Sequence, residues 1–288
     1  IKKVVEYSQN KFETKHVGYN ITTNGSLLTE ESINFLIEND FSLLISLDGP
    51  QDIQNRHRRY RNNLNSTYES VIKKVYKIKE LNELYFQKKV RFNPVIMPDE
   101  DPNIVIDFFN SLSIAPEKCN LLSANLCGVD YFYQSEFIKG ITHNKSADYF
   151  NKKSNEDIYK RYKNKAPLSE IHHHNGPCVP MLNRFFVNCY GDIFTCEKII
   201  ESDSAKLGNV AKDSSLDFTR IENMLNIGKL TEEQCQKCYA FRLCSICAIS
   251  CFDPESHSLS SKQKLEACQQ MKKSVDNFLL NYAKERTK

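Results

Sequence analysis

The chain has 288 residues, of which 40% are apolar and 26% charged, enough for one large or two ordinary globular domains. Its net charge is only +3, so the composition argues against a nucleic-acid or membrane-surface partner. No apolar stretch approaches the roughly 20 residues of a membrane-spanning helix, and the first residues lack the apolar core of a secretory signal. We therefore expect a cytoplasmic protein with no nucleic-acid and no membrane partner.

Strand-like and helix-like patterns alternate through the first 124 residues. The chain starts at Ile1, partway into a pattern of helical spacing, so we expect the true amino terminus to lie upstream. The nearly continuous apolar run at 41–47 is typical of a strand buried on both faces of a parallel sheet. The alternation predicts βα units that form an incomplete, open barrel. The predicted strands are 17–23, 41–47, 89–97 and 120–124, and the predicted helices are 29–37, 66–81 and 104–112.

The amino-acid composition of the chain changes after these units. Residues 128–177 are polar, rich in Lys and Asn and without a clear chemical motif, and we interpret them as a connector or insertion. The segment 184–196 alternates around Gly191, which predicts a β-hairpin, and 261–284 is an amphipathic helix. The expected organisation is a partial α/β barrel over 1–127, the connector over 128–177, a cysteine-rich domain over 178–271 and a carboxyl-terminal helix over 272–288.

Eleven cysteines are distributed very unevenly along the chain. The first 118 residues contain none, Cys119 and Cys127 follow, and the rest lie beyond the connector. Because a reducing compartment disfavours disulfides and thiolates bind soft metals, this clustering indicates a local metal site. Cys119 and Cys127, outside the cluster, are interpreted as buried thiols. The clustered candidate ligands are Cys178, Cys189, Cys196, Cys235, Cys238, Cys244, Cys247, Cys251 and Cys268.

The spacing of these cysteines is informative. Gly191 lets the hairpin turn tightly and so returns Cys196 toward Cys178. The CxxC pair at 235 and 238 lets two sulfurs face one metal centre. Cysteine counts alone do not exclude a structural zinc site, since two zinc ions take eight ligands. Cys189 stays ambiguous, because regular pairing of the hairpin would orient it with Val187, toward the apolar face.

Several motifs resemble a known family. The segments Thr22–Thr29 (TTNGSLLT) and Ile45–Pro50 (ISLDGP) resemble the third and fourth βα units of radical S-adenosylmethionine (SAM) enzymes. The stretch Cys178–Cys268 resembles the SPASM domain of those enzymes, which carries two auxiliary 4Fe-4S clusters. The resemblance covers nearly the whole chain except about 128–177. The motifs at 196–198 (CEK), 208–210 (GNV) and 238–244 (CYAFRLC) look most like the maturases that install thioether crosslinks in cysteine-rich ribosomal peptides of the ranthipeptide and sactipeptide types.

The resemblance also implies roles for particular residues. The second auxiliary cluster would be held by Cys235, Cys238, Cys244 and Cys268. The first would be held by Cys178 and Cys196, joined by either Cys247 or Cys251, with Cys189 as a further candidate. Ser46 and Arg58 match positions that contact SAM, and Asn93, a polar residue in a buried strand, is a weaker candidate of the same kind. Glu197 stands where sulfatase-maturing relatives have an acidic proton acceptor.

One family motif is missing from this sequence. The CxxxCxxC loop, whose thiolates hold the third cluster that cleaves SAM, is expected upstream of Ile1, so the chain as given should be inactive alone. The predicted function is a radical SAM oxidoreductase that modifies a ribosomal precursor peptide, supplied with electrons by a donor such as flavodoxin or ferredoxin. The alternatives are an enzyme like the anaerobic sulfatase maturases and a non-catalytic zinc-binding or scaffold protein derived from the fold.

Overall fold

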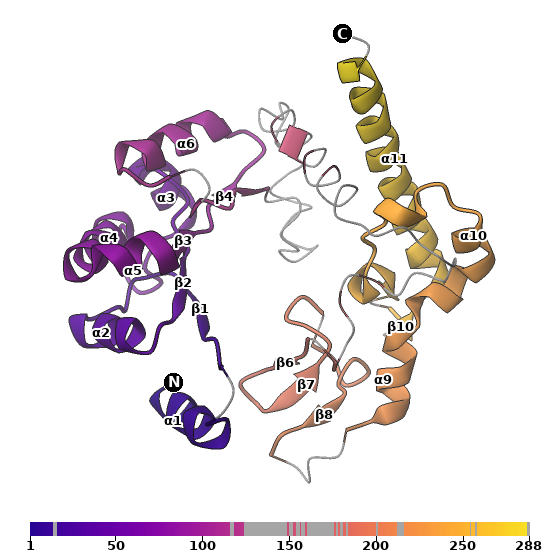
Figure 1. The fold of residues 1–288 in the computed structure, drawn as a ribbon, viewed down its shortest axis with the longest axis horizontal. Coiled ribbons are helices and arrows are strands. Elements are labelled where there is room, and N and C mark those ends of the chain that lie inside the picture. The colour runs from indigo at the N-terminus through magenta and orange to yellow at the C-terminus, as the bar shows by residue number, and fades with distance from the viewer. Residues whose placement is uncertain are drawn as a thin grey trace. The chain divides into compact units, whose positions relative to one another are not determined.

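The chain divides into two compact units, Ile1–Phe150 and Asn151–Lys288, each of which is described by itself. Figure 1 shows the ribbon of both units. Cys127 and most of the expected connector lie outside the described residues. The computed structural model describes residues 1–13, 16–115 and 118–123, scattered positions between 149 and 178, and from 181 onward all residues except 183, 200, 212–215, 254, 257, 287 and 288.

Parallel strands form the centre of the first unit. The strands β1 (Asn20–Thr23), β2 (Ser42–Ile45) and β3 (Val90–Phe92) make one sheet in that order. A second parallel pair consists of β4 (Val95–Ile96) and β5 (Leu122–Ser123). The helices of the unit are α1 (Lys2–Lys11), α2 (Glu30–Glu38), α3 (Gln51–His57), α4 (Tyr68–Leu81), α5 (Glu83–Lys89) and α6 (Pro102–Ser111).

The predicted α/β class and βα alternation are confirmed, with two differences in detail. The run at 89–97 begins inside α5 and is split into β3 and β4, because Pro94 has no N–H to donate to a ladder. The helices α3 and α5 were not predicted, since each has seven residues, too few to show a helical period. The start of α2 follows the sequence signal, because Thr29 and Ser32 form a reciprocal capping box.

The two faces of the three-stranded sheet differ in burial. Leu43, Ile45, Val90 and Phe92 alternate onto one face and are at most 1% exposed. In Figure 1, α2, α4, α5 and α6 lie on one side of the strands, and side chains from them complete this core. Leu44, on the opposite face, is half-buried. The expectation that β2 is buried on both faces is therefore wrong, because the described helices cover one face only.

The second unit combines small sheets with short helices. An antiparallel sheet has the order β6 (Phe186–Val187), β7 (Asp192–Phe194) and β8 (Gly208–Asn209). The pair β9 (Phe252–Asp253) and β10 (Ser258–Leu259) is also antiparallel. The helices are α9 (Phe218–Leu225), α10 (Glu232–Gln236) and α11 (Ser261–Arg286), with 3-10 turns at Ile227–Thr231, Phe241–Leu243 and Ala248–Cys251. The predicted hairpin and long final helix are thus both present. Among the described helices, none has the length and apolar composition needed to cross a membrane.

Gly191 closes the hairpin between β6 and β7. Its φ of 81° lies in the left-handed region, and a Cβ built there would lie 3.1 Å from a methyl carbon of Val210. The Asn188 carboxamide accepts from the backbone N–H groups of Tyr190 and Asp192, both at 2.9 Å. The turn therefore requires glycine, and it fixes the strand that leads to Cys196.

Replacing Gly191 by alanine tests this requirement. The Gly191→Ala variant should lose about 1–2 kcal/mol of unfolding free energy, because an L residue is strained in the left-handed region. Gly18→Ala is the matched control, since a Cβ at Gly18 meets no atom within 4 Å. Thermal unfolding of the two variants should separate them, and equal melting temperatures would contradict the assignment.

Candidate functional site

Four of the predicted ligand cysteines line one cavity in the second unit. Cys235 lies in α10, Cys238 and Cys244 lie in the turns that follow, and Cys268 lies in α11. All four line a cavity together with apolar residues and two lysines of α11. The sequence prediction that these four belong together therefore matches their placement around a common space.

A succession of tight turns brings three of these cysteines to the cavity. The Cys238 N–H donates to the Cys235 carbonyl at 3.1 Å, and the Phe241 N–H donates to the Cys238 carbonyl, also at 3.1 Å. The Cys244 N–H then donates to the Phe241 carbonyl at 3.3 Å. Each bond joins residues three apart, so the chain returns to the same side at each turn. The intervals of three and six residues between these cysteines thus match the three-residue steps of the turns.

Two of the thiols around the cavity, those of Cys244 and Cys268, have a raised pKa. Burial is the main cause of the raised pKa of Cys244, and the charges of Cys268, Cys235 and Cys238 add to it. Burial also raises the pKa of Cys268, against an opposing effect of the nearby Lys264. Binding of a metal centre here therefore releases protons and must supply the positive charge that stabilises the thiolates. Among the described residues, no three Cys, His, Asp or Glu side chains are close enough together to share a single metal ion.

A second group of cysteines gathers near Arg184. The Arg184 side chain interacts electrostatically with both Cys178 and Cys196. Cys196 accepts a hydrogen bond from the Lys198 N–H at 3.3 Å and interacts electrostatically with Cys247. These are three of the residues expected at the first auxiliary cluster. Cys247 interacts electrostatically with Cys196 and also with Cys251, so the choice between Cys247 and Cys251 as the third member stays a prediction.

Cys251 and Cys189 occupy opposite kinds of environment. Cys251 is fully buried against Ile227 and Ile246, and burial raises its pKa to about 12. Cys189 is exposed in the turn between β6 and β7. The parity argument for Cys189 is wrong in its premise, because Val187 is 36% exposed and its neighbour Phe186 contacts the core instead. A ligand role for Cys189 stays a prediction.

Glu197 forms an ion pair with Arg184 at the edge of the same group. Partial burial raises the pKa of Glu197, but the hydrogen bond and charge of Arg184 outweigh it, so that the pKa is lowered from its ordinary value. A carboxylate held ionised in this way accepts a proton less readily than a free one. A role as proton acceptor therefore requires that Arg184 move away or that the pair rearrange when substrate binds.

Two of the predicted SAM-contacting residues lie at the carboxyl ends of adjacent strands. The Ser46 N–H donates to the Thr23 carbonyl at 2.8 Å, and the Asn93 N–H donates to the Ile45 carbonyl at 3.0 Å. The ladder thus continues one residue beyond β2 and β3 and places both residues at one edge. The Asn93 Oδ1 atom is buried without a hydrogen-bond partner. A buried polar atom of this kind is an available binding group for a ligand.

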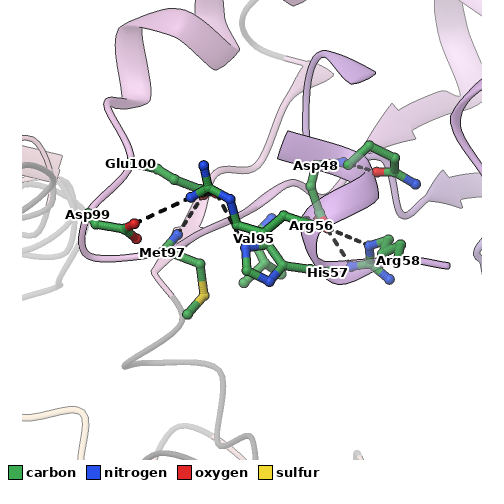
Figure 2. A network of polar contacts seen from close by, with 9 residues as sticks. Asp48, Arg56, His57, Arg58, Val95, Met97, Asp99 and Glu100 are labelled. Carbon is green, nitrogen blue, oxygen red and sulfur yellow. Dashed lines mark hydrogen bonds and ion pairs between the residues drawn. The ribbon is translucent and has the colours of Figure 1, made fainter. Parts of the chain in front are cut away.

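Arg58 has an internal partner that the sequence analysis missed. Its Nε donates to the Asp48 Oδ2 atom at 2.6 Å, and its Nη2 donates to Oδ1 at 3.1 Å. Figure 2 shows this two-point contact. Asp48 is 2% exposed, and its Oδ1 also accepts from the Val95 N–H at 3.0 Å. A role of Arg58 toward SAM stays a prediction and must use the guanidinium atoms that this pair leaves over.

The Asp48–Arg58 pair belongs to a closed ring of hydrogen bonds. The Asp48 N–H donates to the Gln54 side chain at 2.8 Å, which donates to the Thr67 hydroxyl at 3.2 Å. The Thr67 hydroxyl donates to the Arg58 carbonyl at 2.8 Å. The sequence held one signal for it, since Asp48 is a charged residue directly after a buried strand, where a partner is required.

A neighbouring ion-pair group also contacts the carboxyl-terminal end of α3. Glu100, which is 4% exposed, accepts from the Met97 N–H at 2.9 Å. The same carboxylate lies 3.4 Å from both the Arg56 and the His57 side chains. Figure 2 shows that this group lies beside the Asp48–Arg58 contact. Two buried carboxylates, from the turns after β2 and β4, thus anchor the same short helix.

Comparison with known proteins supports the sequence resemblance. No family model matches the chain. Cysteine-type anaerobic sulfatase-maturating enzymes from two strains of Clostridium perfringens are each 23% identical to it, over 87% of this chain and 69% of theirs. The radical SAM cyclopropyl synthase TigE of Paramaledivibacter caminithermalis is 29% identical over 111 residues, which are 38% of this chain and 20% of TigE.

Solved structures resemble the chain over nearly its full length. Histidine-tagged anSMEcpe with bound AdoMet matches with a TM-score of 0.63 at 18% identity, over 99% of this chain and 77% of its own. Native anSMEcpe with bound AdoMet and the Cp18Cys peptide matches with a TM-score of 0.65 at 17% identity, over 99% and 81%. The chain has the fold of a radical SAM enzyme with a SPASM domain. Its curated relatives are radical SAM enzymes.

The Asp48–Arg58 pair yields a stability prediction. Arg58→Ala removes two charge-assisted hydrogen bonds from a buried carboxylate and should lower the unfolding free energy of the first unit by about 2 kcal/mol. Arg59→Ala is the control, because the Arg59 side chain is exposed and donates to the Asn55 carbonyl rather than to a buried carboxylate. Urea unfolding followed by circular dichroism measures both. A loss in Arg58→Ala no larger than in Arg59→Ala would show that the pair is not a structural anchor.

Proposed function

We propose that this chain is part of a radical SAM enzyme that modifies a peptide, with auxiliary 4Fe-4S clusters in its cysteine-rich unit. The observation that carries the proposal is the cavity lined by Cys235, Cys238, Cys244 and Cys268. Four cysteine thiolates are the usual ligand set of a 4Fe-4S cluster. The buried side chain of Lys264 also lines this cavity, and a cation there suits a group of thiolates.

The first auxiliary cluster is assigned to the group near Arg184. Cys178, Cys196 and Cys247 would be its ligands, and the hydrogen bond from the Lys198 N–H would help to orient Cys196. Cys251 is left as a buried thiol between the two groups, in electrostatic contact with Cys247, Cys244 and Cys268. Cys189 completes this set only if the turn at 188–191 changes on binding.

SAM would bind at the carboxyl ends of β2 and β3. When bound to its own cluster, SAM supplies the radical chemistry of the family. The Asn93 Oδ1 atom offers an unused acceptor and the Ser46 hydroxyl offers a donor, and both suit a polar cofactor. The Asp48–Arg58 ring would hold the loop after β2 in one conformation, so that little ordering is left for the cofactor to impose.

The substrate class is proposed from the relatives and from the site together. The curated relatives include enzymes that mature sulfatases and one that synthesises a cyclopropyl group, and one structural neighbour was solved with the Cp18Cys peptide. We propose a ribosomal precursor peptide as substrate, thioether crosslinking as the reaction and a flavodoxin- or ferredoxin-type protein as electron donor. A reaction like that of the sulfatase maturases is the second candidate, favoured by Glu197 beside Cys196 and by relatives that match 87% of the chain.

Metal analysis of the anaerobically purified chain tests the cluster proposal. Cys238→Ala should lose about four iron and four sulfide per chain relative to the unchanged protein, because one 4Fe-4S cluster loses a ligand. Cys119→Ala should keep its full iron and sulfide content. Zinc without acid-labile sulfide in the unchanged protein would support the zinc-binding alternative instead.

Two further substitutions in the same assay test whether Cys247 or Cys251 is a ligand of the first auxiliary cluster. Cys247→Ala should lose iron and sulfide of its own, separate from the loss in Cys238→Ala, whereas Cys251→Ala should keep both. Loss of iron and sulfide in Cys251→Ala but not in Cys247→Ala would make Cys251 the ligand instead. Loss of all iron in every one of these variants would show a general folding defect, which circular dichroism of the same samples detects.

Binding of SAM tests the other half of the proposal, in a chain that also carries the CxxxCxxC loop. Asn93→Ala and Ser46→Ala should each weaken SAM binding several-fold, by on the order of 1 kcal/mol, because each removes one hydrogen bond. Ser42→Ala is the control, since Ser42 lies at the opposite end of β2. Calorimetry measures the affinities, and auxiliary iron content should be unchanged in all three. Unaltered SAM affinity in both test variants would remove this edge as the site.

A further inference from the structure

Lys264 in α11 is buried to an unusual degree for a lysine. It is 2% exposed and ranks among the largest fully buried side chains of the described residues. Lysines are rarely buried without a partner, because removal of an ammonium group from water is costly. Its position therefore calls for an interaction that stabilises the charge.

All three N–H groups of the Lys264 ammonium have an acceptor. The Nζ atom donates to the Ile227 carbonyl at 2.6 Å, to the Gly228 carbonyl at 3.4 Å and to the Cys235 Sγ atom at 3.5 Å. Among the described residues, no carboxylate forms an ion pair with it. The sulfur of Cys235 is thus the one partner of Lys264, within the described part of the chain, that can carry a negative charge.

The same sulfur has a second neighbour with a donor group. The Thr231 hydroxyl, on a residue that is 3% exposed, lies 3.5 Å from the Cys235 Sγ atom. One cysteine of the four therefore has two buried hydrogen-bonding groups. The charge of Lys264 also acts to lower the pKa of Cys268, so it reaches a second thiol of the cavity as well.

We infer that Lys264 is a positioning residue that sets the reduction potential of the second auxiliary cluster. This inference rests on the proposed function, because it requires a cluster in the cavity. Reduction adds one electron to the cluster and so increases its negative charge. A buried cation that hydrogen-bonds a ligand sulfur stabilises the reduced form more than the oxidised one, and the surrounding low dielectric strengthens the effect. Lys264 therefore raises the potential of this cluster.

Substitutions in α11 separate the charge of Lys264 from its packing. Lys264→Gln keeps a hydrogen-bond donor and removes the charge, Lys264→Met removes both, and Lys264→Arg keeps the charge. Lys272→Met is the matched control, because Lys272 lines the same cavity from the same helix but is exposed, and its charge acts less strongly on Cys268 than that of Lys264. Reductive titration with dithionite, followed by electron paramagnetic resonance, measures the potentials in the reconstituted protein. The signal that Cys238→Ala abolishes identifies the cluster.

The expected result is a shift to more negative potential in Lys264→Gln and a larger one in Lys264→Met. Lys264→Arg and Lys272→Met should stay close to the unchanged protein. Full iron content together with an unshifted potential in Lys264→Gln would overturn the inference and leave the proposed function standing. Absence of iron and sulfide from the unchanged protein would overturn both.

A substitution of an uncharged residue provides a second test in case the lysine variants do not fold. Thr231→Val removes the hydroxyl beside the Cys235 sulfur with little change of shape, and should shift the potential in the same direction but less. If the Lys264 variants fail to retain iron, the reduction potential of Thr231→Val becomes the test of the inference. An unshifted potential in Thr231→Val would contradict the inference that groups bonded to the Cys235 sulfur set the potential of this cluster.

Discussion

Within the part of the chain that the structure describes, the apolar core of the second unit is divided rather than continuous. Its described buried side chains fall into four separate clusters of three to five residues each. The first unit, in contrast, has a single continuous cluster that runs from the sheet through its helices. Under the proposed function, cysteine ligation is the constraint that would join these separate clusters into one unit.

This constraint explains the local structure of the unit. The stretch 235–244 contains the end of α10 and a 3-10 turn, and its hydrogen bonds between residues three apart bring three cysteines to one cavity. The long helix α11 runs beside these turns and contributes both Cys268 and the buried Lys264 to their cavity. Burial raises the pKa of Cys244, Cys251 and Cys268, so a metal centre bound at these thiols would have to displace their protons. Under the proposed function, cluster binding and folding would thus be coupled in this half of the chain.

Much of this organisation could be read from the sequence. Period-two and period-3.6 patterns located the strands and long helices, since each element buries one continuous face. The cysteine spacings grouped four residues that line one cavity, because residues three apart in a tight turn must share a side, and their role as ligands stays a prediction. The choice between Cys247 and Cys251 could not be made, since it depends on which of two nearby turns reaches Cys196. The partner of Arg58 was also missed, because the pair joins residues on either side of a helix too short to show a period.

The break between β3 and β4 has a consequence for loop engineering. Since Pro94 interrupts the ladder, the Val95 N–H is free to donate to the Asp48 carboxylate, which in turn holds Arg58. The segment between β2 and α4 is therefore tied to a strand that begins more than thirty residues after Arg58. It is not a module that can be exchanged between homologous scaffolds by matching its end points. A graft of this loop would have to bring along the Asn93-Pro94-Val95 corner, or accept a buried carboxylate with one donor fewer.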